Sequence, residues 1–133
     1  MKTHGAVIGA LIGITLLATS CASARPASKT AEFPPVLHGV WEGGVTSCKK
    51  PGNRDSDRRI EIGPRELLGY EDSQDLLEIE QVSSAPLAWK VRSRLHVYEE
   101  TSELSQIFLI SGQNKGRLTI VNESQSTHYE RCL

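Results

Sequence analysis

The sequence predicts an all-β fold, a small antiparallel meander of about eight short strands closed into a barrel. Hydrophobic residues recur at every second position wherever a period can be read, and turn-forming residues separate these runs at short intervals. No run in the folded part shows the spacing of a long helix. An open meander leaves two sheet edges unpaired, whereas closure pairs them, so a barrel is favoured over a sandwich.

The first half of the folded unit contains four expected strands, at residues 37–43, 59–62, 66–71 and 77–80. Ile60 and Ile62 alternate with charged residues, and Leu77 and Ile79 do the same. This alternation is typical of strands with one face in the core and one in solvent. Residues 64–68 could instead form one turn of helix, because a proline begins the segment.

The second half contains four more expected strands, at residues 89–98, 103–111, 118–120 and 128–132. In the first of these, Trp89, Val91, Leu95 and Val97 share one parity, which is typical of a long strand with one exposed face. The second is more continuously apolar, and the last two are short extended runs. Turn-forming residues separate the strands at residues 51–53, 63–64, 84–86, 112–116 and 122–125.

Residues 1–20 are interpreted as an export signal rather than as part of the fold. Lys2 and His4 precede an uncharged apolar run at residues 6–19. As a helix, this run of fourteen residues would rise only about 21 Å against a bilayer core of roughly 30 Å. A permanent membrane span is therefore disfavoured, and cleavage after export is expected.

The signal ends in Leu17-Ala18-Thr19-Ser20-Cys21, which resembles the lipobox of bacterial lipoproteins. The resemblance implies that Cys21 is acylated, that the signal is cut before it, and that the lipid anchors the protein. By resemblance to enteric lipoproteins, Ala22 suggests the outer membrane, with the domain facing the periplasm. Alternatively, residues 22–24 fit ordinary secretory cleavage, which would release a soluble periplasmic protein beginning at Arg25.

Residues 21–35 are expected to be the lipidated Cys21 and a flexible linker, and residues 36–133 the barrel domain. The linker is small, polar and proline-bearing, so it buries too little surface to offset the entropy of ordering it. Cys48 and Cys132 then remain as an even pair in an oxidising compartment. Because barrel closure makes the first and last strands neighbours, these two cysteines are expected to form a disulfide.

The segment at residues 37–41, Leu-His-Gly-Val-Trp, contains the G-x-W pattern with which lipocalins and other calycin-type barrels begin. The resemblance implies that Gly39 permits a tight entry into the first strand. It also implies that Trp41 plugs the closed end of the barrel. The overall layout is similar to that of small uncharacterised envelope lipoproteins of proteobacteria, which confers no activity.

A second resemblance concerns the periplasmic inhibitors of secreted metalloproteases, which are small eight-stranded barrels. Leu37, Gly39, Trp41 and Cys48 match the opening of those inhibitors. In that family the residues just before the barrel enter the protease cleft. By position these would be residues 32–36 here.

The charge balance and the motif content disfavour several functions. Lys and Arg number 15 against 16 Asp and Glu, so the chain lacks the basic surface of a nucleic-acid-binding protein. His38, His96 and His128 form no short ligand motif, and there is no G-x-S-x-G sequence. Asp55-Ser56-Asp57 resembles part of a calcium loop, but the two arginines that follow favour a solvated turn. We therefore expect no catalytic residue, no metal and no cofactor.

The strand at residues 89–98 carries a distinctive exposed face, formed by Lys90, Arg92, Arg94, His96 and Tyr98. Alternate residues of a strand lie about 6.6 Å apart, so these cations could together bind an acidic partner or an anionic glycan. Alternatively, they pair with Glu78 and Glu80 on the preceding strand, as cross-strand charges commonly do.

Together these patterns predict a non-enzymatic periplasmic lipoprotein that serves as a binding or envelope-maintenance module. Its expected partners are the membrane, through the lipid anchor, and a periplasmic protein or envelope component, but not nucleic acid. The alternative is an inhibitor of a periplasmic hydrolase, either a metalloprotease or a lysozyme.

The variant Cys21→Ser is expected to be released from the membrane or mislocalised, because it removes the thiol placed for acylation. Detergent partitioning and the intact mass of the mature protein measure this directly. A mature wild-type mass that begins at Arg25 and carries no acyl chain would contradict the anchor.

Overall fold

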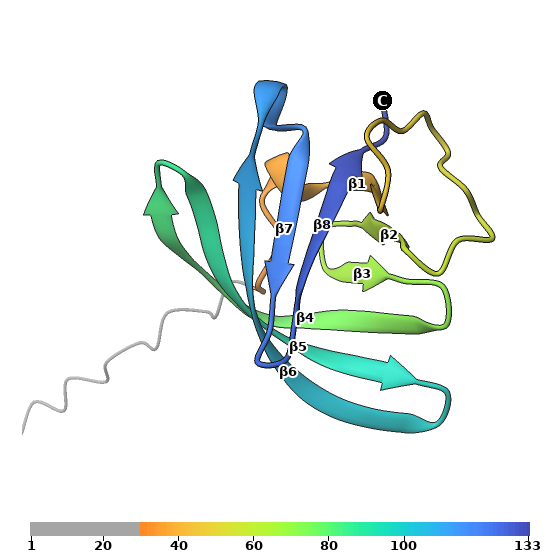
Figure 1. Cartoon of the computed structure of the whole chain (residues 1–133). Coiled ribbons are helices and arrows are strands. Elements are labelled where there is room, and N and C mark those ends of the chain that lie inside the picture. The colour runs from red at the N-terminus through yellow and green to blue at the C-terminus, as the bar shows by residue number, and fades with distance from the viewer. Residues whose placement is uncertain (1–29) are drawn as a thin grey trace, which may run out of the picture.

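The computed structural model describes residues 30–133. Eight antiparallel strands form a closed barrel in which each strand pairs with its neighbours in the sequence and β8 pairs with β1 (Figure 1). The predicted all-β barrel is confirmed. The expected export signal, Cys21 and most of the linker lie outside the described residues.

The strands in chain order are β1 (Gly39–Gly43), β2 (Arg59–Ile62), β3 (Glu66–Leu68), β4 (Asp72–Ser84), β5 (Leu87–Val97), β6 (Glu100–Ser111), β7 (Arg117–Val121) and β8 (Ser126–Arg131). Two 3₁₀ turns accompany them, η1 (Pro35–Leu37) before β1 and η2 (Gln113–Lys115) between β6 and β7. No helix within residues 30–133 is long and apolar enough to cross a membrane. Strands β4, β5 and β6 are longer than the others, so their connecting hairpins project from the barrel (Figure 1).

Several element boundaries differ from those expected. Leu37 lies in η1 rather than in the first strand, because Pro35 fixes the φ angle that begins a 3₁₀ turn. Residues 64–68 contain strand β3 and not a helical turn. The backbone N–H of Gly69 donates to Asp72 O at 2.9 Å, so a turn ends β3 earlier than residue 71. Tyr98 lies in the β5–β6 turn with φ 53°, outside the strand.

The inward face of β4 changes parity along its length. Gln74 and Leu76 are buried in its first half, whereas Leu77 and Ile79 are partly buried in its second half. An irregularity in the pairing with β5, between Leu76 and Glu78, accounts for the change. The alternation of Leu77 and Ile79 in the sequence therefore identifies the inward face of only the second half of this strand.

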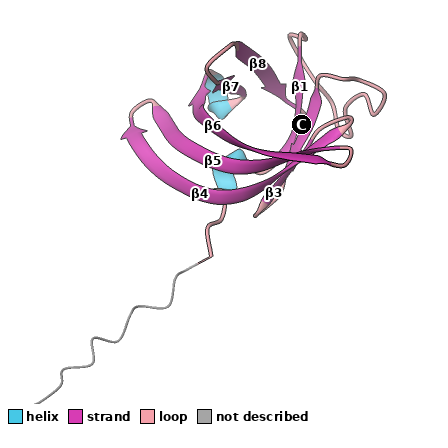
Figure 2. Cartoon of the chain, turned by 90° about the horizontal axis from the view of Figure 1, so that it is seen from below, coloured by secondary structure: helices cyan, strands magenta, loops and turns pink. Residues whose placement is uncertain are grey.

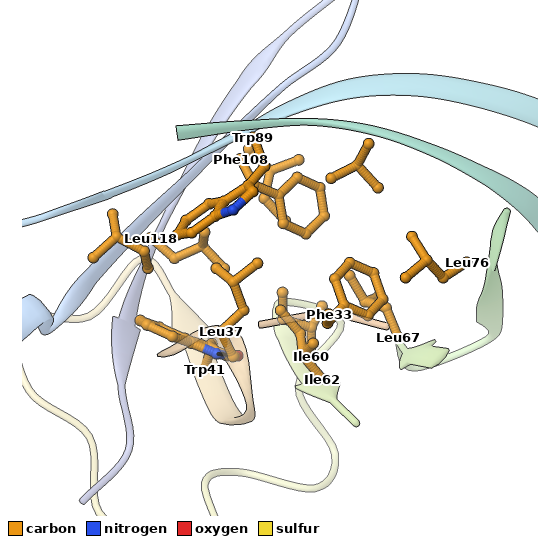
Figure 3. Close-up of a cluster of buried hydrophobic side chains, with 13 residues drawn as sticks. Phe33, Leu37, Trp41, Ile60, Ile62, Leu67, Leu76, Trp89, Phe108 and Leu118 are labelled. Carbon is orange, nitrogen blue, oxygen red and sulfur yellow. Dashed lines mark hydrogen bonds between the residues drawn. The ribbon is translucent and has the colours of Figure 1, made fainter. Parts of the chain in front are cut away.

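One end of the barrel is filled by apolar side chains that include residues from before the first strand (Figure 3). The ring of Phe33 stacks on that of Phe108, with centroids 5.8 Å apart, and Phe33 is only 2% exposed. Leu37 and Trp41 are fully buried, and Trp41 Nε1 donates to Leu37 O at 2.9 Å. The folded unit thus begins at Phe33, within the segment assigned to the linker from its composition.

Arg131 at the end of β8 joins the two ends of the chain. Its guanidinium lies 4.0 Å from the centroid of the Trp41 ring, and residues 131 and 41 are register partners across β1 and β8. The same group donates to the backbone carbonyls of Val36 and His38. Burial lowers the pKa of Arg131 from its ordinary value, and the ring and the two carbonyls offset the cost of burying the charge.

The β1–β2 loop (residues 44–58) folds back over the outer face of β1. Glu42 is buried beneath it and accepts hydrogen bonds from Ser56 Oγ and from the backbone N–H of Asn53. Cys48 in this loop forms a disulfide with Cys132, and their Cα atoms are 4.3 Å apart. The predicted disulfide is confirmed, and it ties the loop to the end of β8.

Arg131→Met is expected to lower the free energy of unfolding by about 2 to 3 kcal/mol, because the partly buried carbonyls of Val36 and His38 lose their donor and Trp41 loses its cation. The matched control is Arg117→Met, which removes an exposed ion pair with Glu130 and should cost less than about 1 kcal/mol. Urea denaturation compares the two. Equal losses would show that Arg131 has no special role in closure.

Replacement of Cys48 and Cys132 by serine is expected to lower stability by on the order of 4 kcal/mol, because the bond closes a long loop in the unfolded chain. Thermal unfolding of the oxidised, reduced and doubly substituted forms measures the loss. Melting temperatures that do not change on reduction would count against this contribution.

Candidate functional site

The turns between β3 and β4, between β5 and β6, and between β7 and β8 gather at one end of the barrel, opposite η1. We name this end the mouth; Figure 2 shows the barrel from below the view of Figure 1. It contains a cavity of about 260 Å³. The cavity is lined by Asp57, Ile60, Leu67, Gly69, Asp72, Gln74, Leu95, Leu104, Gln106, Ile120, Asn122, Gln125, Thr127 and Tyr129.

Three adjacent strands place buried polar side chains on the inner wall at inward positions: Gln74 on β4, Ser93 on β5 and Gln106 on β6. Ser93 Oγ donates to Gln74 Oε1 at 2.9 Å, so these two groups satisfy each other. Gln106 is 7% exposed, and its Oε1 is buried with no hydrogen-bond partner in the described part of the chain. A buried amide oxygen without a partner costs free energy unless something else donates to it.

Two ionisable groups on opposite sides of the mouth are perturbed by burial. Desolvation raises the pKa of Asp72, at the start of β4, from its ordinary value. Burial and, to a smaller extent, the nearby carboxylate of Asp72 raise the pKa of Tyr129 on β8. The phenol of Tyr129 therefore stays neutral over the physiological range and can donate its O–H into the cavity.

The side chains that line the mouth offer hydrogen bonds beside apolar wall residues. Four amide side chains and the hydroxyls of Thr127 and Tyr129 can donate or accept, and two carboxylates accept. Among the described residues, the lining includes no His, Cys, Lys or Arg. This arrangement can orient a small polar molecule, as binding pockets do with a few polar groups placed on an apolar wall.

A larger depression, of about 500 Å³, lies on the outer surface beside β7 and β8. Four of its polar side chains already have partners within the chain: Arg117 pairs with Glu130 at 2.9 Å, and Thr119 Oγ1 lies 2.9 Å from His128 Nδ1. Because these four groups are satisfied within the chain, the mouth is the stronger candidate.

The exposed face predicted on β5 is present, but acidic partners occupy much of it. Arg92 pairs with Glu78 at 3.2 Å, which is one of the cross-strand pairings that the sequence left open, and with Glu103 on β6 at 3.1 Å. The remaining predicted members are Lys90 opposite Glu80, Arg94 opposite Glu103 on β6, His96 paired with Asp75 at 2.9 Å, and Tyr98, whose hydroxyl donates to Glu71.

The structure places the residues of the G-x-W segment at the filled end. Gly39 has φ +124°, a backbone conformation that residues with a Cβ rarely adopt, so glycine is required at this entry to β1. Trp41 lies two residues further on, inside the barrel. The two therefore support the end opposite the mouth and do not contact a ligand bound there.

His38, His96 and His128 lie on different elements and each has a hydrogen-bond partner. Within residues 30–133, no three His, Cys, Asp or Glu side chains gather in a way that could hold a metal ion. Ser56, from the segment that resembles a calcium loop, donates to Glu42.

Sequence reasoning missed Asp72, Gln74, Gln106 and Tyr129. A usable signal was present for Gln106, because it shares the inward parity of Leu104, Phe108 and Ile110 on β6. A polar residue at an inward position of a strand indicates either an internal network or a ligand. For Asp72 and Tyr129 the sequence carries no such signal, because their approach depends on closure of the barrel.

Neither a protein-family model, nor a curated protein, nor a solved structure matches this chain. The candidate site therefore stands on its geometry.

Asp72→Asn is expected to stabilise the barrel at neutral pH. Because the pKa of Asp72 is raised, the folded state binds this proton more tightly than the unfolded state, and the ionised carboxylate costs stability. The cost is present above the raised native pKa and disappears as the pH falls below the ordinary value of 3.8. The melting temperature of the variant should exceed that of the wild type at neutral pH and approach it in acid.

The control for this measurement is Asp55→Asn, which changes an exposed carboxylate in the β1–β2 loop. A stabilisation of Asp72→Asn that persists unchanged in strong acid would contradict desolvation as its cause.

Proposed function

We propose that this protein is a non-enzymatic ligand-binding lipoprotein of the bacterial envelope, and that the mouth of its barrel binds a small polar compound. Acylation at Cys21 would hold it at the outer membrane with the domain in the periplasm. The lipobox-like sequence at residues 17–21 supports the anchor, and the disulfide between Cys48 and Cys132 fits an oxidising compartment.

The observation that carries the binding proposal is Oε1 of Gln106, in the wall of the cavity, which has no hydrogen-bond partner among residues 30–133. Isolated polar groups are rarely buried in a core, because an apolar side chain of similar size would avoid the desolvation cost. Leu104 and Phe108 flank Gln106 on the same inward face, so an apolar residue would also continue the pattern of the strand. A ligand that donates a hydrogen bond to Oε1 accounts for the amide.

The resemblance to metalloprotease inhibitors has less support. In those proteins the segment before the barrel is free to enter the protease cleft, whereas here Phe33 is buried against Phe108. The backbone N–H of Phe33 donates to Pro64 O at 2.7 Å, and its carbonyl lies 2.8 Å from His38 Nε2. Withdrawing residues 32–36 for an inhibitory contact would therefore open the core.

Gln106→Leu is expected to abolish ligand binding while stabilising the free protein by about 1 to 2 kcal/mol, because it removes a buried amide without a partner. Thermal shift against a panel of small polar metabolites, followed by calorimetry, measures both effects. The control is Gln113→Leu in the exposed η2 turn, which should keep binding and change stability by less than about 0.5 kcal/mol. A ligand bound equally well by Gln106→Leu, or a panel without any ligand, would refute the mouth as the binding site.

A further inference from the structure

We propose that the ligand of the mouth is a small organic cation that carries N–H donors, of the primary amine or guanidine class. This inference rests on the proposed function and adds to it the charge and the size of the ligand.

The charged groups in the cavity wall all have one sign. Asp57 from the β1–β2 loop and Asp72 from β4 are carboxylates, and among the described residues no basic side chain lines the cavity to neutralise them. Arg58, which follows Asp57, lies against Gly44 on the loop side. An anionic ligand would meet uncompensated repulsion in the mouth, whereas a cation would be attracted.

The rim of the mouth extends this negative charge. Each of its three hairpin turns contains an exposed glutamate: Glu71 between β3 and β4, Glu99 between β5 and β6, and Glu123 between β7 and β8. Of the cations on the barrel wall, Arg59 pairs with Glu61 at 2.9 Å and Arg92 pairs with two glutamates, so neither adds free positive charge near the rim. Charges of one sign around a concave entrance raise the local concentration of ligands of the opposite sign.

Gln106 adds a hydrogen-bonding requirement that does not depend on the carboxylates. Its side chain is more than nine-tenths buried and lines the cavity, and its Oε1 lacks a partner in the part of the chain that the structure describes. Rotation of an amide can present nitrogen in place of oxygen, so Gln106 alone would accept ligands of either kind. The carboxylates in the wall accept hydrogen bonds as well, so a ligand rich in donors satisfies both features, and their negative charge favours N–H donors carried by a cation.

The volume of the cavity and its apolar lining residues limit the size and the shape of the ligand. About 260 Å³ corresponds to the volume of roughly nine water molecules, which suits a ligand of about six to nine non-hydrogen atoms. Leu95, Leu104 and Ile120 form apolar wall between the polar groups. A short carbon chain with a cationic nitrogen at each end matches this pattern.

The test uses three four-carbon compounds that differ in charge: 1,4-diaminobutane, 1,4-butanediol and succinate. Calorimetry on the mature, oxidised protein should show binding of the diamine, at least about tenfold weaker binding of the diol and none of succinate. Binding of the diamine should weaken as salt is raised, because the attraction is electrostatic. Asp72→Asn should weaken it about tenfold, and Gln106→Leu should abolish it, whereas Asp55→Asn outside the cavity should leave it unchanged.

Binding of the diol or succinate as tightly as the diamine would overturn the inference about charge and leave the proposed function standing. If none of the three compounds binds, the inference about charge is also overturned. The metabolite panel and the Gln106→Leu variant test the proposed function separately. Equal effects of Asp72→Asn and Asp55→Asn would place the cation outside the cavity and overturn the inference as well.

Discussion

Closure of the barrel depends on the contact between its first and last strands, and Arg131 is the residue that secures it. Its guanidinium covers the Trp41 ring and binds two carbonyls of the segment that leads into β1. One side chain from the end of the chain therefore orients the start of the sheet and the η1 turn. Without this contact, β1 and β8 would be edge strands with unpaired backbone groups, and Phe33 and Leu37 would lose the wall against which they pack.

The apolar packing at one end of the barrel determines which inward side chains the other end can hold. The aromatic side chains and η1 occupy the end near Trp41, so the inward positions toward the opposite turns are left with less apolar packing. Gln74, Ser93 and Gln106 lie at those positions. Ser93 and Gln74 bond to each other, which leaves Gln106 as the group whose burial the fold does not explain. The division between a packed end and a polar end is what makes the cavity a candidate site.

The sequence predicted the parts of the fold that depend on local pattern. Alternation identified β2 and β5, and cysteine parity with closure predicted the bond from Cys48 to Cys132. It did not reveal Phe33 as a core residue, because two prolines and polar neighbours hide a contact made with distant Phe108. The polar inward residues of the mouth also weaken the alternation, which is why the first half of β4 was not anticipated. Site residues contributed by separate strands become neighbours only after closure.

The disulfide also has a consequence for limited proteolysis. It joins residues 84 positions apart, so a single cut at any point between Cys48 and Cys132 leaves both pieces in one covalent molecule. The projecting hairpins that join β4 to β5 and β5 to β6 both lie within this ring (Figure 1). A protease that nicks either hairpin would open the chain without releasing a fragment, and the nick would appear on a gel only after reduction. In an environment rich in proteases, the molecule could thus survive damage at its most accessible turns with its mass intact.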